Sequence, residues 1–129
     1  MKVFIVEDSA TVRGHLQLMM SDIPGVSVVG SAADEQGAIV RINEMQPDVV
    51  TLDLCLQQGS GLGILEYLKL QHPAIKVIVL TNNVDEFYVD SCKRSGAAFV
   101  FDKTFQFSRV NSVLWSWINA GQSPVFTGN

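Results

Sequence analysis

The sequence predicts an α/β domain of the (βα)5 type, a doubly wound five-stranded parallel sheet with helices on both faces. Two observations support this fold class. Apolar runs of strand length alternate with helical patterns five times along the chain. Several of these runs are nearly continuous Val, Ile and Leu, which is typical of parallel strands buried on both faces. Right-handed crossovers between such strands would place the helices on the two faces of the sheet.

The five strand candidates are short apolar runs, and they span residues 2–7, 26–31, 48–54, 75–81 and 97–102. The first helix candidate follows Ser9, a residue suited to cap a helix N-terminus. The other four have apolar residues three or four positions apart, and they span residues 34–45, 62–71, 84–95 and 106–119. The helices stop at residues that favour turns or cannot continue a helix, namely Pro24-Gly25, Pro47, Pro73 and Gly96.

Composition narrows the class of protein. The 129 residues fit one domain, predicted over residues 1–120, and the composition of residues 121–129 predicts a flexible C-terminal tail. A net charge of -4 argues against direct binding of nucleic acid by this chain. No apolar stretch approaches the ~18 residues of a membrane span, so no membrane association is expected. Two cysteines and no signal peptide favour a reducing, cytoplasmic location.

Polar residues follow four of the five apolar runs. Glu7-Asp8 follows the first, Asp53 ends the third, Thr81 ends the fourth and Lys103 follows the fifth. The strands of a parallel sheet point the same way, so these side chains are expected to gather at its carboxyl edge, where such sheets bind ligands. Three carboxylates, a hydroxyl and an ammonium suit a divalent cation and a phosphoryl group.

Each of these residues also has an ordinary interpretation when it is taken alone. Adjacent acids are usually solvated, and Asp53 could cap a helix or occupy a surface turn. Thr81 could be an ordinary strand residue, and Lys103 a solvated charge. However, Asp53 closes a strongly apolar strand, where burial of a carboxylate is costly without a partner. The hard oxygen ligands, without histidine or a usable thiol, favour magnesium over zinc.

The ordered motifs resemble the receiver domain of two-component response regulators, and the likeness extends from Val3 to Ile118. The motifs that carry it are Val6-Glu7-Asp8-Ser9, Leu52-Asp53-Leu54, Gly61, Leu80-Thr81, Gly96-Ala97 and Asp102-Lys103. The resemblance implies a flavodoxin-like sheet with strand order 2-1-3-4-5. It also implies transfer of a phosphoryl group from a histidine kinase or histidine phosphotransferase to Asp53.

The resemblance further implies a Mg²⁺ or Mn²⁺ site made by Asp8, Asp53, the backbone carbonyl of Cys55 and, largely through water, Glu7. Lys103 would bind the phosphoryl oxygens, and Thr81 would move to hydrogen-bond another of them. The only chemistry expected is self-catalysed phosphotransfer and autodephosphorylation, so the domain is expected to act as a switch.

Four positions depart from the pattern of the family. Val100 stands at the switch position three residues before Lys103, where an aromatic residue is usual, and Phe99 and Phe101 should face the opposite way. The usual coupling between the threonine and this aromatic is therefore in question, and the signal could travel through the fourth helix instead. The other departures are Gln57 and Thr104 at positions where proline is usual, and Asn82 where a small residue is usual.

Gln57 leaves the loop over residues 57–61 with more backbone freedom. Cys55, Asn82 and Asn83 flank the expected phosphoryl position and are interpreted as residues that tune its lifetime.

The expected output is contact with a downstream protein or with a second copy of the chain. Receivers commonly use the face made by the fourth helix, fifth strand and fifth helix. In the fifth helix, Trp115 falls outside the apolar stripe, which consists of Val110, Val113, Leu114, Trp117 and Ile118. Trp115 is therefore a candidate partner contact, and cover by the tail is the alternative.

Three other functions compete with a phosphorylatable receiver. A phosphorylation-independent interaction module would keep the acidic pocket without using it, and the departures at Asn82, Val100 and Thr104 favour that alternative. A hydrolase of the haloacid dehalogenase type needs a second acid two residues after its nucleophile, where this chain has Cys55. A flavodoxin-like electron carrier needs a phosphate-binding loop after the first strand, which is missing.

Overall fold

The computed structural model describes residues 1–82 and 85–122, and its five strands and five helices alternate as predicted. The strands are β1 (Lys2–Val6), β2 (Ser27–Ala32), β3 (Val49–Asp53), β4 (Lys76–Thr81) and β5 (Ala97–Asp102). The helices are α1 (Ala10–Ser21), α2 (Glu35–Met45), α3 (Gly61–Gln71), α4 (Glu86–Arg94) and α5 (Arg109–Gln122). The strands form one sheet in the order β2-β1-β3-β4-β5, and every neighbouring pair is parallel. The predicted fold class and strand order are confirmed.

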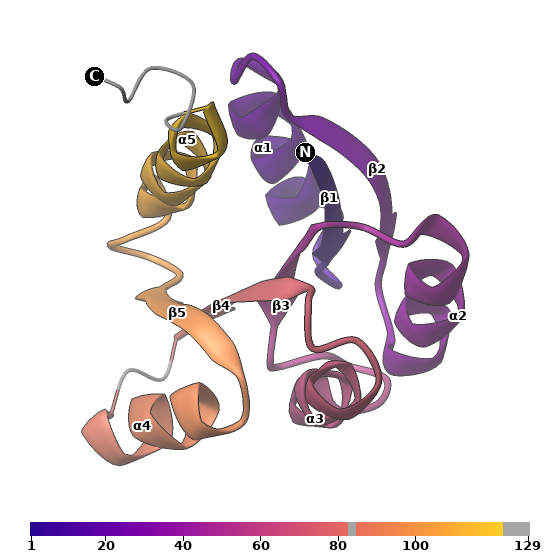
Figure 1. Ribbon diagram of the computed structural model, residues 1–129. Helices are drawn as coiled ribbons and strands as arrows, with labels where there is room; N and C mark the ends of the chain where they lie inside the picture. The colour runs from indigo at the N-terminus through magenta and orange to yellow at the C-terminus, as the bar shows by residue number, and fades with distance from the viewer. Residues whose placement is uncertain (83–84, 123–129) are drawn as a thin grey trace.

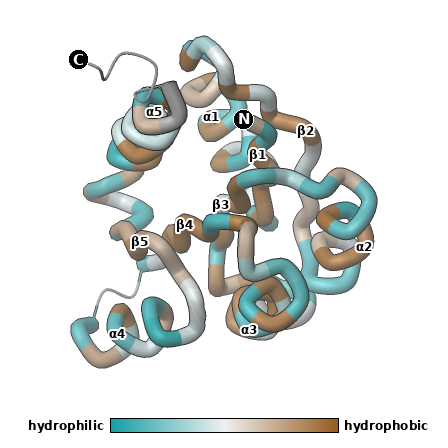
Figure 2. Tube along the Cα trace, in the orientation of Figure 1, coloured by the Kyte–Doolittle hydropathy of each residue, from teal (hydrophilic) through white to brown (hydrophobic). Residues whose placement is uncertain are grey.

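The helices form two layers around the sheet. Helices α1 and α5 lie on one side of it, and α2, α3 and α4 lie on the other (Figure 1). Strands β1 and β4 are hydrophobic along most of their length, whereas each helix alternates between hydrophilic and hydrophobic residues (Figure 2). This difference follows from position, because an inner strand has a helix layer on each side and a helix has water on one side.

Each side of the sheet has its own apolar core. The core under α1 and α5 includes Ile5, Leu16, Met20, Ile78, Val110 and Leu114. The core under α2, α3 and α4 includes Phe4, Ile42, Leu52, Leu65, Val79 and Cys92. Alternate residues of one strand therefore contribute to opposite cores, which fixes the register of each strand.

Four helices begin at side chains that accept a backbone N–H of the first turn. These N-cap residues are Ser9 for α1, Asp34 for α2, Ser60 for α3 and Asp85 for α4. Each cap satisfies a donor that the helix itself leaves unpaired, and such caps typically contribute ~1 kcal/mol.

The largest difference from the predicted boundaries is at α5, which begins at Arg109 instead of residue 106. Oδ1 of Asp102 accepts the backbone N–H groups of Thr104 at 2.7 Å and Phe105 at 2.9 Å. These bonds hold the chain in a turn conformation, so α5 begins three residues later than predicted. At its other end α5 continues to Gln122, three residues beyond the predicted helix end at 119 and two beyond the predicted domain boundary at 120.

The remaining boundaries differ from the predicted ones by no more than two residues. Helix α4 begins at Glu86, whereas the prediction started it at residue 84. Residues 83–84 and 123–129, including Asn83 and most of the predicted tail, lie outside the described residues. None of the described helices has both the length and the hydropathy that a membrane span needs.

Candidate functional site

The acidic residues of the candidate site meet at the carboxyl edge of the sheet. Glu7 and Asp8 follow β1, and Asp53 is the last residue of β3, the strand that pairs with β1. One carboxylate oxygen from each of the three residues lies within 4.8 Å of the other two. Glu7 and Asp53 are 1% and 3% exposed, so two of the three carboxylates are buried. Such crowding of buried negative charge requires a cation.

Lys103 brings one cation into this cluster from the end of β5. Its ammonium donates to Oε2 of Glu7 at 3.1 Å and to Oδ2 of Asp53 at 3.1 Å. Oε1 of Glu7 lies 2.9 Å from the same ammonium, yet among the described residues it accepts no hydrogen bond. A single lysine thus bridges two carboxylates, and Oε1 of Glu7 is paired with it by charge without an aligned hydrogen bond.

The environment shifts the protonation equilibria of this pair. Burial raises the pKa of the Glu7 carboxyl, and the lowering effect of its hydrogen bond with Lys103 does not offset this. For Lys103, burial lowers the pKa, but its contacts with Glu7 and Asp53 outweigh burial and raise it above the ordinary value. The ammonium therefore remains charged at neutral pH.

Backbone N–H groups of the loop after β3 orient the other carboxylate oxygens. Cys55 donates its N–H to Oδ1 of Asp53 at 2.9 Å, and Gln57 donates to Oδ2 of Asp8 at 3.1 Å. Gly61 is buried against the backbone of Asp53 and Leu54, so closely that a Cβ at this position would overlap both. The loop is therefore held at several points, and the greater backbone freedom expected from the glutamine at position 57 stays a prediction.

Thr81 is buried at the end of β4. Its aromatic neighbour is Tyr88 of α4, a residue that the sequence pattern did not place at the site. Burial raises the pKa of the Tyr88 hydroxyl, and a side-chain hydrogen bond with Thr81 acts in the opposite direction. Tyr88 packs against the same core as Val100. The signal available in the sequence was only an aromatic residue on the apolar stripe of a helix, which is usually core packing.

Alternation along β5 separates Val100 from the aromatic residues beside it, as predicted. Val100 packs against the core under α2, α3 and α4, whereas Phe101 belongs to the core under α1 and α5. Phe99 stacks on Phe101 with a distance of 5.5 Å between ring centroids. Neither phenylalanine can therefore replace the missing aromatic side chain at position 100.

Two other departures from the family pattern lie next to each other. Asn82 and Thr104 are exposed, and the Thr104 hydroxyl donates to the side-chain oxygen of Asn82 at 3.5 Å. Cys55 is also exposed. Asn83 is outside the described residues, so its position relative to the site is not described.

A groove of about 400 Å³ lies between β5 and α5. Its lining consists of Phe99, Phe101, Arg109, Ser112, Val113, Ser116 and Trp117. Trp115 is 42% exposed but does not line this groove. Trp117 is half-buried and contacts both Phe99 and the ammonium of Lys76. The sequence pattern does not indicate this groove, because Phe99 and Phe101 fit the pattern of a strand and Trp117 fits the apolar stripe of a helix.

Comparisons with known proteins agree with this architecture. A family model of the response regulator receiver domain matches residues 3–114. A protein-glutamate methylesterase/protein-glutamine glutaminase of Geobacter metallireducens is 37% identical over 94 residues, which are 73% of this chain and 27% of that protein. The chain thus spans about a quarter of the length of this curated relative.

Two solved structures extend the comparison to the fold. The response regulator domain of Thermotoga maritima CheB has a TM-score of 0.80 and 27% identity, covering 93% of this chain and 94% of that one. A LuxR-family response regulator from Aurantimonas has a TM-score of 0.83 at 23% identity, covering 93% and 85%, a likeness of fold. Because the family model matches residues 3–114, which are most of the chain, the chain belongs to the response regulator receiver domain family.

Proposed function

We propose that this chain accepts a phosphoryl group on Asp53 from a phosphohistidine of a histidine kinase or histidine phosphotransferase, in a Mg²⁺-dependent reaction. The observation that carries the proposal is the Lys103 ammonium held between the Asp53 and Glu7 carboxylates, with Asp8 in the same cluster. Phosphorylation would change the protein–protein contacts of the domain. The complete set of acids, threonine and lysine weighs against a phosphorylation-independent module.

The residues at the site fit a divalent cation. Three carboxylates offer hard oxygen ligands within 4.8 Å of one another, and the single Lys103 ammonium beside them offsets only part of their charge. Asp8, Asp53 and the Cys55 carbonyl would hold the ion, with Glu7 acting largely through water. Mg²⁺ or Mn²⁺, when bound, would neutralise charge on the phosphoryl oxygens.

The chain's own residues account for the other requirements of transfer. A carboxylate oxygen of Asp53 attacks phosphorus, an O–P bond forms, and the P–N bond to the donor imidazole breaks with its electron pair leaving on nitrogen. Lys103 lies 3.1 Å from Oδ2 of Asp53, so its ammonium can exchange this contact for one with a phosphoryl oxygen. The Cys55 N–H orients Oδ1 of the same carboxylate. These contributions are positioning and electrostatic stabilisation.

Intact mass measurement after incubation with Mg²⁺ and acetyl phosphate tests the proposal. Wild type should gain one phosphoryl group, and Asp53→Ala should gain none. Asp90→Ala, which removes an exposed aspartate from α4, is the matched control and should be phosphorylated like wild type. Absence of the added mass from wild type with several donors, or its persistence in Asp53→Ala, would contradict the proposal.

We further propose that Cys55, Asn82 and Asn83 tune the lifetime of the aspartyl phosphate, because they follow Asp53 and Thr81 by one or two positions in the sequence. Substitution at Asn83 should change the dephosphorylation rate and leave the fold intact. Equal decay rates for wild type and several Asn83 variants would rule this role out.

The partner surface of this proposal is the face formed by α4, β5 and α5, used for a downstream protein or a second copy of the chain. Its aromatic groove and the exposed Trp115 supply the type of side chain that contributes most to binding energy at protein interfaces. Trp115→Ala should weaken partner or dimer binding while thermal stability is kept. Unchanged binding would remove Trp115 from the interface. We do not propose nucleic-acid binding by this chain, given its net charge of -4.

A further inference from the structure

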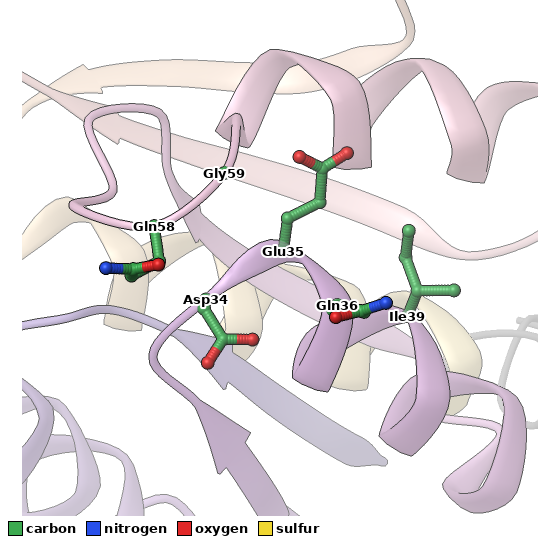
Figure 3. Close-up of a pocket in the computed structure, with 6 residues that line it drawn as sticks. All are labelled: Asp34, Glu35, Gln36, Ile39, Gln58 and Gly59. Carbon is green, nitrogen blue, oxygen red and sulfur yellow. The ribbon is translucent and has the colours of Figure 1, made fainter.

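Glu35, the first residue of α2, fastens the loop that joins β3 to α3. Its Oε1 accepts the backbone N–H of Ser60 at 2.7 Å, and its own N–H donates to the carbonyl of Gln58 at 3.2 Å. Figure 3 shows the Glu35 side chain extending from the start of α2 toward the loop that carries Gln58 and Gly59, while Asp34 points away. Two hydrogen bonds of opposite polarity therefore fix this loop to α2.

Two glycines make room for the Glu35 side chain. A Cβ built on Gly59 would overlap the Cβ of Glu35, and a Cβ on Gly63 would lie 2.6 Å from Oε2 of its carboxylate. Both separations are shorter than non-bonded atoms tolerate, so a side chain at position 59 would collide with Glu35, and one at position 63 would displace the Glu35 carboxylate. Glu35 is half-exposed, and its carboxylate is oriented by the Ser60 N–H and by the space that the two glycines leave.

Backbone donors and helix termini stabilise the Glu35 carboxylate. It lies beside the first turn of α3, next to the N-cap Ser60, and it belongs to the first turn of α2. The positive ends of both helix dipoles therefore favour its charge. No ion pair involves Glu35 among the described residues. Its hold on the loop therefore depends on directional hydrogen bonds to the backbone.

The loop that Glu35 holds contacts the acidic cluster at two points. Ser60, which Glu35 holds, is followed by Gly61, and Gly61 packs against the backbone of Asp53 and Leu54. In the middle of the loop, Gln57 donates its N–H to Oδ2 of Asp8. Displacement of the loop at Ser60 would therefore disturb the backbone that positions two of the three carboxylates.

From these contacts we propose that Glu35 is a positioning residue for phosphoryl transfer, which holds the β3–α3 loop in the arrangement that the divalent cation requires. The proposal rests on the function proposed above. Glu35 does not touch the reacting atoms, so its loss should affect cation affinity more than the rate at saturating cation. Preorganisation of a loop contributes to affinity by lowering the cost of ordering it on binding.

The test compares Glu35→Ala, Glu35→Gln and Glu44→Ala. Glu44→Ala is the control, because it removes an exposed carboxylate from the last turn of the same helix. Phosphorylation by acetyl phosphate is measured against Mg²⁺ concentration. Glu35→Ala should raise the half-saturating Mg²⁺ concentration about fivefold and change the maximal rate less than about twofold. Glu35→Gln keeps an acceptor oxygen and should restore most of the affinity, and Glu44→Ala should match wild type.

Gly63→Ala tests the same contact from the other side. Its Cβ would displace the Glu35 carboxylate, and alanine itself favours the helix, so stability should be kept while Mg²⁺ dependence shifts as in Glu35→Ala. In the Glu35→Ala background, Gly63→Ala should have no further effect on this dependence. Additive effects of the two changes would contradict a shared mechanism.

Amide hydrogen exchange in metal-free protein provides a readout that does not depend on phosphorylation. Glu35→Ala should accelerate exchange at Ser60 and Gln57, and calorimetry should show weaker Mg²⁺ binding. If Glu35→Ala shows the same exchange rates and the same Mg²⁺ affinity as wild type, Glu35 has no positioning role. If wild type itself takes up no phosphoryl group, the proposed function fails, whereas exchange and calorimetry still decide the role of Glu35.

Discussion

The ammonium of Lys103 lies 3.1 Å from Oδ2 of Asp53, although 50 positions separate the two residues in the chain. The same ammonium contacts Glu7, so one lysine offsets part of the charge of two buried carboxylates. A bound divalent cation and a phosphoryl group would each change this balance.

Lys103→Met should have opposite effects on cation binding and on phosphoryl transfer. Loss of the ammonium removes a positive charge that competes with the cation, so Mg²⁺ should bind about fivefold more tightly, a change of about 1 kcal/mol. Phosphorylation should slow by at least about tenfold, because the phosphoryl oxygens lose a charged donor. Calorimetry and intact mass measure the two effects. Lys93→Met, an exposed lysine on α4, is the control, and weaker Mg²⁺ binding in Lys103→Met would contradict the prediction.

Mg²⁺ should stabilise the folded domain and EDTA should reverse the effect. A ligand that binds only the folded state at about ten times its Kd adds about 1.4 kcal/mol, which corresponds to roughly 3–6 °C in Tm for a domain of this size. Thermal unfolding followed by circular dichroism measures this shift. Asp8→Asn removes one carboxylate charge from the cluster and should reduce the shift by more than half. An equal shift in Asp8→Asn would place the ion elsewhere.

Tyr88→Phe should uncouple Thr81 from α4 without preventing phosphorylation. The variant keeps the ring that packs on the core but removes the hydroxyl that hydrogen-bonds with Thr81. Stability should fall by about 1 kcal/mol, and amide chemical-shift changes in α4 on phosphorylation should shrink. The control is Tyr67→Phe, which removes a hydroxyl bonded to Asn43 on the α2–α3 side. If the α4 chemical-shift changes on phosphorylation are as large in Tyr88→Phe as in wild type, coupling from Thr81 to α4 through the Tyr88 hydroxyl is excluded.

The two cysteines should differ strongly in reactivity in the native protein. Cys55 is exposed, whereas Cys92 is buried and burial raises the pKa of its thiol. Reaction with iodoacetamide requires the thiolate and access to it, so Cys55 should be alkylated at least about tenfold faster. Peptide mass spectrometry resolves the two sites, and unfolding in guanidinium should equalise them. Similar native rates would show that α4 opens readily.

Several features of the fold and the site could be predicted because they depend on local pattern. The near-continuous apolar strands predicted a parallel sheet, and the residues at strand ends predicted which side chains share its carboxyl edge. Alternation along β5 correctly separated Val100 from Phe99 and Phe101. Period and direction along a strand are properties of the backbone, so a sequence expresses them directly.

Other features depended on contacts that no local pattern encodes. Glu35 and Tyr88 have ordinary roles in their own helices, a first-turn acid and a residue on an apolar stripe. Their contacts with the β3–α3 loop and with Thr81 arise only after the helices pack. The late start of α5 likewise follows from Asp102 accepting two backbone N–H groups, which competes with helix formation.

The sequence by itself therefore determined the class of fold, the strand order through the family resemblance, and the identity of the residues at the carboxyl edge. Only the tertiary structure decided which of those side chains are buried, which charges pair, and which backbone groups hold them in place. Lys103 bridges Glu7 and Asp53, and the loop after Asp53 is tied to α2 by Glu35. The reason is physical, because burial and the pairing of charges depend on distances between segments far apart in the chain, and these distances exist only once both apolar cores have formed.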